Sequence, residues 1–336
     1  AATLIEDQWT AYYVIDTSSV ENTDLTVTIT VYDNAGNDST IAGIGNVDID
    51  MSAPTIENIY AENGLYGIGE TVDIYVDFSE AVQKYLTKAG SPILHLSNGE
   101  TAAYNSALSN AVGADTLAFS YTVGDGDADD DDLNVTYVDV VTGSSYIRDL
   151  VGNDADTTLT TSNDLSHDCA VQIDGNKPIV TDGNISISGA SGIAGAYIIG
   201  DEVTATWDSD EAGDDIDSVK VDFSTFGGPI AVTATDDEGT YTATYTIVAG
   251  AIDASNLNVS VTAWDDAENS TTTADGTNAT VDNVKPEFDS SHVEITGATG
   301  ENDIFILGDT VKVVWDSLEV DDAIDSVNVN FTLLGG

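Results

Sequence analysis

The chain has 336 residues, enough for two to three domains, and its 60 acidic residues against seven basic ones give a formal net charge of −53. This charge argues against nucleic acid as a partner, because phosphate binding needs lysine and arginine. With no run of 18 apolar residues, the sequence also predicts no membrane insertion in this segment. Apolar residues still make up 41% of the chain, so we expect a folded, very acidic protein.

Short runs in which apolar and polar residues alternate predict β-strands along the chain. In chain order, the clearest runs cover residues 72–78, 117–123, 203–207, 219–223, 241–247 and 257–263. About seven such strands in each stretch of roughly 100 residues, separated by turn-forming residues, are typical of an antiparallel β-sandwich. The predicted fold class is therefore all-β, with sandwich modules in tandem.

Two internal repeats support an array of sandwich-sized modules. Residues 199–228 and 307–336 match at an offset of 108, with Trp207 on Trp315 and Phe223 on Phe331. A second match pairs Trp9, Tyr13, Leu25, Asp33 and Asn37 with Tyr241, Tyr245, Leu257, Asp265 and Asn269. Arrays of this kind favour a structural role over a catalytic one.

Three segments with the spacing Asp-x-x-x-Pro, beginning at Asp50, Asp174 and Asp282, predict the module boundaries. Proline donates no hydrogen bond to a strand ladder and suits a linker or a strand start. We therefore predict a C-terminal half module at 1–53, complete modules at 54–177 and 178–285, and an N-terminal half module at 286–336.

The two predicted half modules are complementary in kind. Gly336 aligns with Gly228, and Ala1 aligns with Thr233, only a few residues later in the repeat. We expect either that the chain is one stretch of a longer array, or that residues 286–336 of one copy pack with residues 1–53 of the next. The predicted partners are thus copies of the chain itself or adjoining modules of the same chain.

Four blocks follow one another within residues 54–177: PTIENIYAENGLYGIGETVDIYVDFSEAV, SPILHLSNGETAAYNS, DTLAFSYTVGDGDADDDDL and IRDLVGND. Together they resemble a bacterial and archaeal Ig-like repeat of large surface proteins. Residues 178–285 are similar at their ends, but DSDEAGDDIDS replaces the SEAV turn. The resemblance implies tandem Ig-like β-sandwiches in a linear array, an extracellular location at the cell surface or in secreted form, and no enzymatic activity.

Acidic turns are the strongest candidates for binding chemistry. Asp33–Asn37, Asp149–Asp154 and Asp265–Asn269 occupy equivalent places in the repeat, and we expect the boundary aspartates at the same end of each module. Ca²⁺ takes six to eight oxygen ligands, which a turn and a linker can supply together. The predicted ligands are Asp33, Asn37, Asp48, Asp50, Asp149, Asn153, Asp154, Asp174, Asp265, Asp266, Asn269 and Asp282. The alternative is that these residues serve only the backbone geometry of the turns.

Two further acidic segments allow the same pair of interpretations, a cation site or a solvated loop. One spans residues 208–217 and is repeated at 316–325, and the other spans 125–132. Divalent cations are therefore predicted partners of the chain as a whole.

Three sequons are predicted to carry glycans: Asn134, Asn258 and Asn330. Each lies between apolar residues that are expected to face inward, so its own side chain is expected to face outward.

The leading functional hypothesis is a structural segment of an extracellular, self-assembling surface protein, either a surface layer or a surface fibre, stiffened by cations. The alternatives are a spacer stalk of a bacterial adhesin and a non-catalytic module of a secreted hydrolase. The sequence contains no nucleophile elbow, phosphate-binding loop, dinucleotide fingerprint or zinc signature, and no catalytic residue is predicted.

Overall fold

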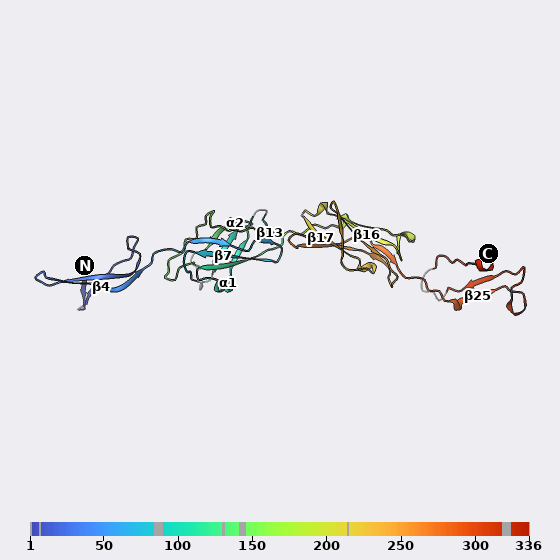
Figure 1. Ribbon diagram of the computed structural model, residues 1–336, viewed down its shortest axis with the longest axis horizontal. Helices are drawn as coiled ribbons and strands as arrows, with labels where there is room; N and C mark the ends of the chain where they lie inside the picture. The colour runs from blue at the N-terminus through green and yellow to red at the C-terminus, as the bar shows by residue number, and fades with distance from the viewer. Residues whose placement is uncertain are drawn as a thin grey trace. The chain divides into compact units, whose positions relative to one another are not determined.

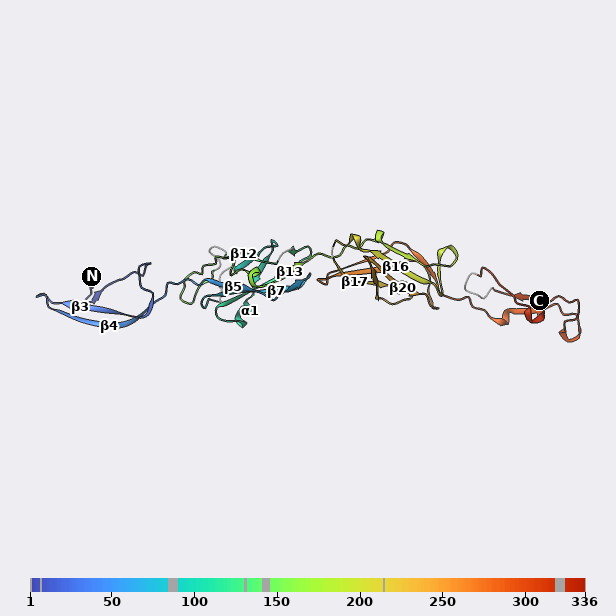
Figure 2. The ribbon, with the colours of Figure 1, turned by 45° about the horizontal axis from the view of Figure 1, so that its top comes forward.

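The computed structural model describes residues 2–6, 8–83, 90–129, 132–140, 146–213, 215–317 and 324–335. Its contacts divide the chain into two units, Ala1–Asn176 and Lys177–Gly336. In both units the regular elements of the described residues are mainly β-strands, joined by turns, loops and short helices (Figures 1 and 2). None of the helices within these ranges is long and apolar enough to cross a membrane.

The first unit begins with two hairpins. They are formed by β1 (Thr3–Ile5) with β2 (Gln8–Thr10) and by β3 (Asn22–Tyr32) with β4 (Asp38–Ile49). Valine and isoleucine recur at every second position of β3, as a strand requires, yet Val27, Ile29 and Val31 are all exposed. The hairpins thus present an apolar face that the rest of their unit leaves uncovered.

The rest of the first unit is a β-sandwich with one continuous core. Its larger sheet has the order β12-β8-β9-β10-β7-β5, and its smaller sheet has the order β11-β13-β6. Their bounds are β5 (Ile56–Tyr60), β6 (Gly64–Tyr66), β7 (Thr71–Phe78), β8 (Ile93–Leu96), β9 (Thr101–Tyr104), β10 (Thr116–Thr122), β11 (Ala128–Asp129), β12 (Val135–Asp139) and β13 (Val171–Asp174). The alternation predicted for 72–78 is confirmed, because Val72, Ile74, Val76 and Phe78 are all buried in this core.

Two short helices interrupt the strands of this sandwich, α1 (Ser106–Ala111) and α2 (Leu165–Asp168). No pattern in the sequence predicted α1. Its start is fixed by Asn105, whose side-chain oxygen accepts hydrogen bonds from the backbone N–H groups of Ala107 and Leu108. The buried Ser109 then accepts a hydrogen bond from the N–H of Ala118, which ties the helix to β10.

The second unit contains a complete sandwich with its own core. Its sheets have the orders β14-β16-β20-β19, β15-β24-β21 and β18-β17-β22-β23. The strands are β14 (Ile185–Ser188), β15 (Tyr197–Ile198), β16 (Glu202–Asp208), β17 (Ile216–Asp222), β18 (Val232–Thr233), β19 (Thr235–Asp237), β20 (Thr240–Thr246), β21 (Asp253–Leu257), β22 (Ser260–Asp265), β23 (Ser270–Ala274) and β24 (Ala279–Asp282). Trp207, Phe223 and Phe226 are the largest fully buried side chains of this core.

The second unit ends in a smaller segment with one strand pair, β25 (Val293–Thr296) and β26 (Lys312–Trp315). Short 3₁₀ helices complete this unit: η1 (Asp182–Asn184), η2 (Ile193–Gly195), η3 (Ser209–Glu211), η4 (Ser224–Phe226), η5 (Ser290–His292), η6 (Glu301–Asp303) and η7 (Thr332–Leu334). The buried residues of the two cores lie within 56–173 and 180–281, inside the ranges predicted for the two complete modules.

The 108-residue repeat is reproduced in the pairing of strands. Ile185 pairs with Trp207 between β14 and β16, and Val293 pairs with Trp315 between β25 and β26, at the same offset. A loop contact is repeated as well, because the Asp201 carboxylate accepts hydrogen bonds from Ser191 and Ile198, and Asp309 does the same for Thr299 and Ile306. The sequence repeat therefore specifies loops as well as strands.

Gly189, which follows β14, tests how strictly the repeat constrains the backbone. Its φ is +114°, and an added Cβ would lie 1.9 Å from the carbonyl oxygen of Glu202. At the equivalent Gly297, φ is +108° and the distance is 2.0 Å to the oxygen of Thr310. We expect Gly189→Ala to lower the free energy of unfolding of module 178–285 by about 2–3 kcal/mol, through backbone strain and overpacking.

The change is measured by urea unfolding followed by tryptophan fluorescence. Gly183→Ala is the matched control, because no atom lies within 4 Å of its added Cβ and its φ is not positive. Equal stabilities of the two variants would show that alanine is tolerated at Gly189 and would contradict this prediction.

Candidate metal centre at the Asp149 turn

Three turns of the form Asp-x-x-x-Asn share one hydrogen-bond pattern. The backbone N–H of the aspartate donates to the carbonyl oxygen of the asparagine, at 2.9 Å for Asp33, 3.1 Å for Asp149 and 3.1 Å for Asp265. In each turn one carboxylate oxygen also accepts bonds from backbone N–H groups two and four residues later. The predicted equivalence of the three turns is therefore confirmed, with the carboxylate serving as an internal cap.

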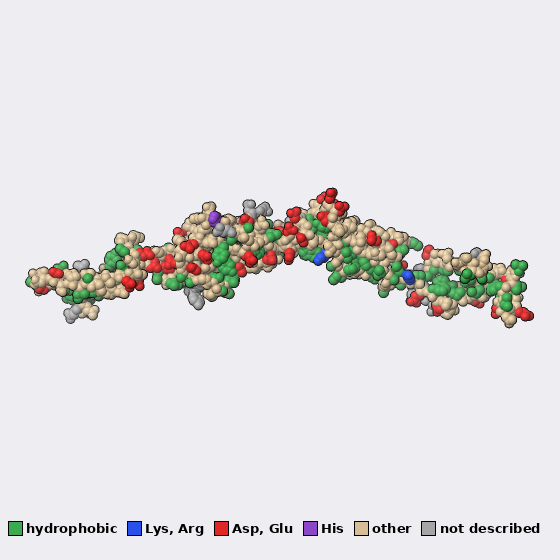
Figure 3. Space-filling view, in the orientation of Figure 1, with side chains coloured by type: hydrophobic (Ala, Val, Ile, Leu, Met, Phe, Trp, Pro, Cys, Tyr) green, Lys and Arg blue, Asp and Glu red, His purple; other side chains and the backbone are tan. Residues whose placement is uncertain are grey.

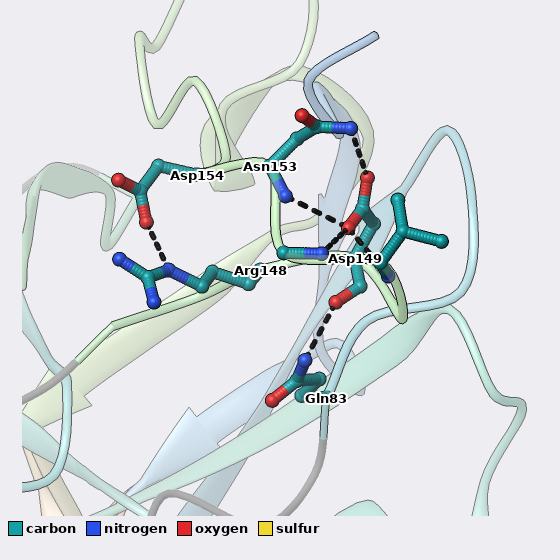
Figure 4. Close-up of polar contacts among 7 residues, drawn as sticks. Gln83, Arg148, Asp149, Asn153 and Asp154 are labelled. Atoms are coloured by element: carbon teal, nitrogen blue, oxygen red, sulfur yellow. Dashed lines mark hydrogen bonds and ion pairs between the residues drawn. The ribbon is translucent and has the colours of Figure 1, made fainter. Parts of the chain in front are cut away.

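The Asp149 carboxylate accepts hydrogen bonds through both of its oxygens (Figure 4). Its Oδ1 accepts hydrogen bonds from the N–H groups of Val151, Gly152 and Asn153, and its Oδ2 accepts one from Asn153 Nδ2 at 2.7 Å. The side chain of Gln83 donates to the Asp149 carbonyl oxygen at 2.9 Å. Only 1% of the Asp149 surface is exposed.

The pKa of Asp149 is set by two opposing causes. Burial acts to raise the pKa, but the hydrogen bonds from Gly152, Asn153 and Val151 stabilise the carboxylate and hold the pKa below its usual value. Asp33, in the exposed β3–β4 turn, also has a lowered pKa, through its bonds from the side chain and backbone of Asn37. Both groups are therefore charged at neutral pH.

Three carboxylates meet beside the Asp149 turn. Asp50 follows β4, Glu80 lies two residues beyond the end of β7, and oxygens of these two residues and Asp149 lie within 4.8 Å of one another. The contact is reinforced because Asn153 Nδ2 donates to the carbonyl oxygen of Asp50 at 3.4 Å. The cluster thus joins the hairpin segment to the sandwich that follows it.

The carboxylates of this cluster repel one another when all of them are ionised. Burial, followed by the charges of Asp50, Asp149 and Glu21, raises the pKa of Glu80 above its usual value. Ionisation of Glu80 as the pH rises therefore costs folding free energy. A bound cation would remove this cost.

The three carboxylates fit a hard cation such as Ca²⁺ in type and in spacing. Calcium–oxygen distances are about 2.3–2.6 Å, so oxygens sharing one ion lie within about 5 Å of each other. Among the described residues, Asp149 Oδ2 accepts one hydrogen bond, from Asn153 Nδ2, and so has a further lone pair to offer. Backbone carbonyls or water would have to complete the six to eight ligands that Ca²⁺ takes.

Of the twelve predicted ligands, Asp50 and Asp149 are brought into this cluster. Asn153 supports it by orienting Asp149 and contacting Asp50. Asp154 forms an ion pair with Arg148 instead.

The boundary aspartates serve the backbone around them. Asp50, Asp174 and Asp282 each accept a hydrogen bond from the N–H two residues later, which shapes the start of each linker. Asp48 accepts a bond from the N–H of Asp24 within the β3–β4 hairpin.

The remaining predicted ligands lie in the other two turns: Asp33, Asn37, Asp265, Asp266 and Asn269. Asp265 and Asn269 are buried beneath the β22–β23 turn, whereas Asp266 is exposed.

Glu80 was not among the predicted ligands, because it lies in SEAV, which entered the predictions only through the family resemblance. The sequence feature that could have identified Glu80 is its position just after the alternating run 72–78, at the end of the strand that approaches the linker. Aligning the two complete modules on Gly69 and Gly200 places Glu80 opposite Glu211. Glu211 instead accepts bonds from Thr181 N, Thr181 Oγ1 and Trp207 Nε1, and so fastens the start of its module.

The other acidic segments also contribute turn contacts. Asp208 caps η3 by accepting a bond from the N–H of Asp210. Asp127 accepts bonds from Tyr121 Oη at 2.8 Å and from the N–H of Gly124 at 2.7 Å. Residues 130–131, 214 and 318–323 of these segments lie outside the described residues.

The three predicted glycosylation sites differ in their surroundings. Asn134 and Asn258 are half-buried, and their side chains bond to Ser166 and Asn278, respectively. Asn330 is exposed, and its side-chain oxygen accepts bonds from Thr332. Of the three, Asn330 is the most accessible to a modifying enzyme.

No protein-family model and no curated protein matches the chain. Among solved structures, the titin I-band fragment I67–I69 aligns at 10% identity, a TM-score of 0.30, and coverage of 69% of this chain and 66% of that fragment. The Escherichia coli adhesin FdeC aligns at 12% identity, a TM-score of 0.26, and coverage of 76% and 74%.

A tetra-tandem repeat from the extending region of a large adhesion protein aligns at 20% identity, a TM-score of 0.20, and coverage of 90% and 66%. The chain therefore spans about two thirds of the titin fragment and of this repeat array. TM-scores this low do not establish a relationship with any of the three.

Proposed function

We propose that this chain is a non-enzymatic structural segment of an extracellular surface protein, in which tandem Ig-like sandwiches serve as spacing and assembling units. The observation that carries the proposal is the repeat itself. Strand register, loop caps and glycine geometry recur at an offset of 108 residues. Repetition of whole modules is how extended proteins gain length without new chemistry.

The acidic surface supports an extracellular setting rich in salt or divalent cations. Acidic side chains are spread over the surface of both units (Figure 3). At this density they repel one another within about 8–10 Å at physiological ionic strength, so screening ions favour the folded state. Within this proposal, Ca²⁺ bound by Asp50, Glu80 and Asp149 stiffens the joint before module 54–177.

Calcium is expected to raise the melting temperature of module 54–177. At a concentration one hundred times its Kd, a single bound ion contributes about 2.7 kcal/mol, which corresponds to a rise on the order of 10 °C. Cys169 is buried and is the only cysteine of the chain, so its protection from thiol reagents on heating reports on this module alone.

Glu80→Gln should change the melting temperature in opposite directions in a chelator and in calcium, relative to the wild type. This variant should melt slightly higher than the wild type in a chelator, because repulsion is relieved, and should lose most of the calcium-induced rise. Glu57→Gln, an exposed substitution on β5, is the matched control and should retain the full rise. A calcium response that is unchanged in Glu80→Gln would exclude this cluster as the site.

Electron microscopy of the assembly on its native surface tests the proposed function as a whole. Ordered sheets or fibres would support a surface layer or surface fibre. Extended single molecules ending in a separate binding domain would instead support an adhesin stalk, and measurable affinity for polysaccharide would favour a module of a secreted hydrolase.

A further inference from the structure

The outer face of the sheet β18-β17-β22-β23 carries an aromatic side chain that the core of module 178–285 does not use. On β22, Val261 and Ala263 are buried in that core. Because successive side chains of a strand point to opposite faces, Trp264 lies on the outer face, where it is half-buried. Its ring is therefore available to something other than core packing.

A hollow of about 290 Å³ lies beside this ring. The described residues that line it are Asp217, Ser218, Lys220, Trp264, Asp265 and Glu268. They come from β17, β22 and the β22–β23 turn, and the pairing of Ser218 with Trp264 brings the two strands together at this point. The hollow thus combines an aromatic surface with several polar groups, as small-ligand sites do.

The lining offers hydrogen-bond donors and acceptors together. The Lys220 ammonium donates and lies 5.1 Å from the centre of the Trp264 ring, while the exposed carboxylates of Asp217 and Glu268 accept. The hydroxyl of Ser218 can do both. A ligand that uses this whole set must itself carry both donors and acceptors.

The charges of the hollow favour a neutral ligand. An anion would meet three carboxylates. An organic cation would have to displace Lys220 from the ring and would then be repelled by it. A sugar hydroxyl would instead give the displaced ammonium an acceptor. A sugar ring also has C–H groups on its faces and hydroxyls around its edge, so it matches an aromatic surface with a polar rim.

The same outer face recurs in the β3–β4 hairpin. The matched positions, at an offset of 232 residues, are Trp264 with Tyr32, Thr262 with Thr30, and Thr272 with Thr40. In both copies the two threonine hydroxyl oxygens lie 2.8 Å apart across the hairpin. The tyrosine ring is 72% exposed. The repeat therefore keeps an aromatic ring beside a hydroxyl pair on the face that the core does not need.

We propose that the outer face around Trp264 binds a neutral saccharide, with one sugar ring stacked on the indole. Asp217 and Glu268 accept hydrogen bonds from its hydroxyls, and Lys220 moves from the indole to donate to another. The volume of the hollow suits a single ring, and the sugar chain continues over the open sheet past Thr262. This ligand goes beyond the proposed spacing function, which needs no saccharide, and it would fasten the segment to the glycans around it.

The indole N–H signals of a ¹⁵N-labelled chain test this site directly. The chain has four tryptophans, and Trp264→Phe identifies the signal of Trp264. The probes are cellohexaose, maltohexaose, mannohexaose and the glycan released from the envelope of the producing cells. We expect at least one of them to shift the Trp264 signal at millimolar concentration, while the signal of Trp207, buried in the core, stays in place.

The probes also separate two sources of the same chemistry. A response to the envelope glycan would support attachment of a structural segment to its own surface. A response to the hexasaccharides alone would support the same site but assign it to external polysaccharide, as expected of a module of a secreted hydrolase.

Trp264→Ala should weaken binding of the responding probe by roughly tenfold or more in isothermal titration calorimetry, because the stacking surface is lost. Thr206→Ala is the matched control. Thr206 lies on the outer face of the other sheet, where its hydroxyl oxygen is 2.6 Å from that of Ser186, and this variant should retain the full affinity.

Three results would overturn the proposed site. One is a Trp264 signal that no saccharide probe shifts. Another is equal affinity of Trp264→Ala and the wild type, which would place the binding elsewhere. The third is a shift caused by tetramethylammonium and by no saccharide, which would make the hollow a site for organic cations. None of them would alter what electron microscopy shows of the spacing function.

Discussion

Replacing Phe223 with alanine is expected to lower the free energy of unfolding of module 178–285 by about 3–5 kcal/mol. Phe223 is fully buried, just beyond the end of β17, and packs against Tyr245. Alanine would leave a cavity between the two halves of the sandwich, and the lost contacts add to the lost transfer free energy. A single module of this size has little stability to spare for such a loss.

Tryptophan fluorescence can report on the unfolding of module 178–285. Its four tryptophans include none within 54–177, and Trp207, at 1% exposure, lies in the core next to the substitution. Urea unfolding followed by tryptophan fluorescence therefore follows module 178–285 against a silent neighbour. Phe288→Ala is the matched control, because Phe288 is 64% exposed, and it should change stability by less than about 1 kcal/mol. Similar losses for both variants would mean that Phe223 is not a core residue.

Much of the fold follows from periodicity alone. The runs at 72–78 and 203–207 became β7 and β16, because alternate apolar residues can be buried only if the backbone is extended. Helix α1 was missed because its six residues are too few for a helical period to show, and its start depends on the single cap Asn105.

Exposure was harder to predict than strand position. Trp9 matches Tyr241, which packs against the core of module 178–285, yet Trp9 is 73% exposed. The match with Tyr241 predicts the strand pattern, but it does not predict burial. Trp9 could be buried only by the other half of a sandwich, which residues 1–53 do not contain. Local sequence thus specifies which face of a strand is apolar, and only the surrounding chain determines whether that face is covered.

The candidate site was predicted only in part, for a related reason. Asp149 and Asn153 form a local motif, four residues apart, that the repeat made visible. Asp50 and Glu80 join them only through the fold, across 99 and 69 residues of sequence, respectively. In a chain with 60 acidic residues, spacing cannot identify such a group.

Replacing Asp149 with alanine should destabilise module 54–177 by about 3–4 kcal/mol. The carboxylate is buried and accepts four hydrogen bonds, three of them from backbone N–H groups that would lose their partner. Hydrogen bonds to a charged group contribute about 1.5–3 kcal/mol each, and buried donors left unsatisfied cost about as much, although the terms overlap. Asp33→Ala changes an exposed turn that lies outside module 54–177. It should therefore have no measurable effect on the stability of that module.

The pH dependence of Asp149→Asn separates the charge of this cap from its shape. The pKa of Asp149 is lowered in the folded state, so its charge stabilises the module fully above the unfolded value of about 3.9 and progressively less as the pH falls through the lower folded value. The wild type should therefore exceed Asp149→Asn in stability at pH 6, and the difference should shrink below about pH 4. Urea-dependent labelling of Cys169 with a disulfide reagent that reacts at acidic pH measures both proteins. A difference that stays constant from pH 6 to pH 2.5 would show that asparagine fails for steric reasons and that the charge of Asp149 contributes nothing.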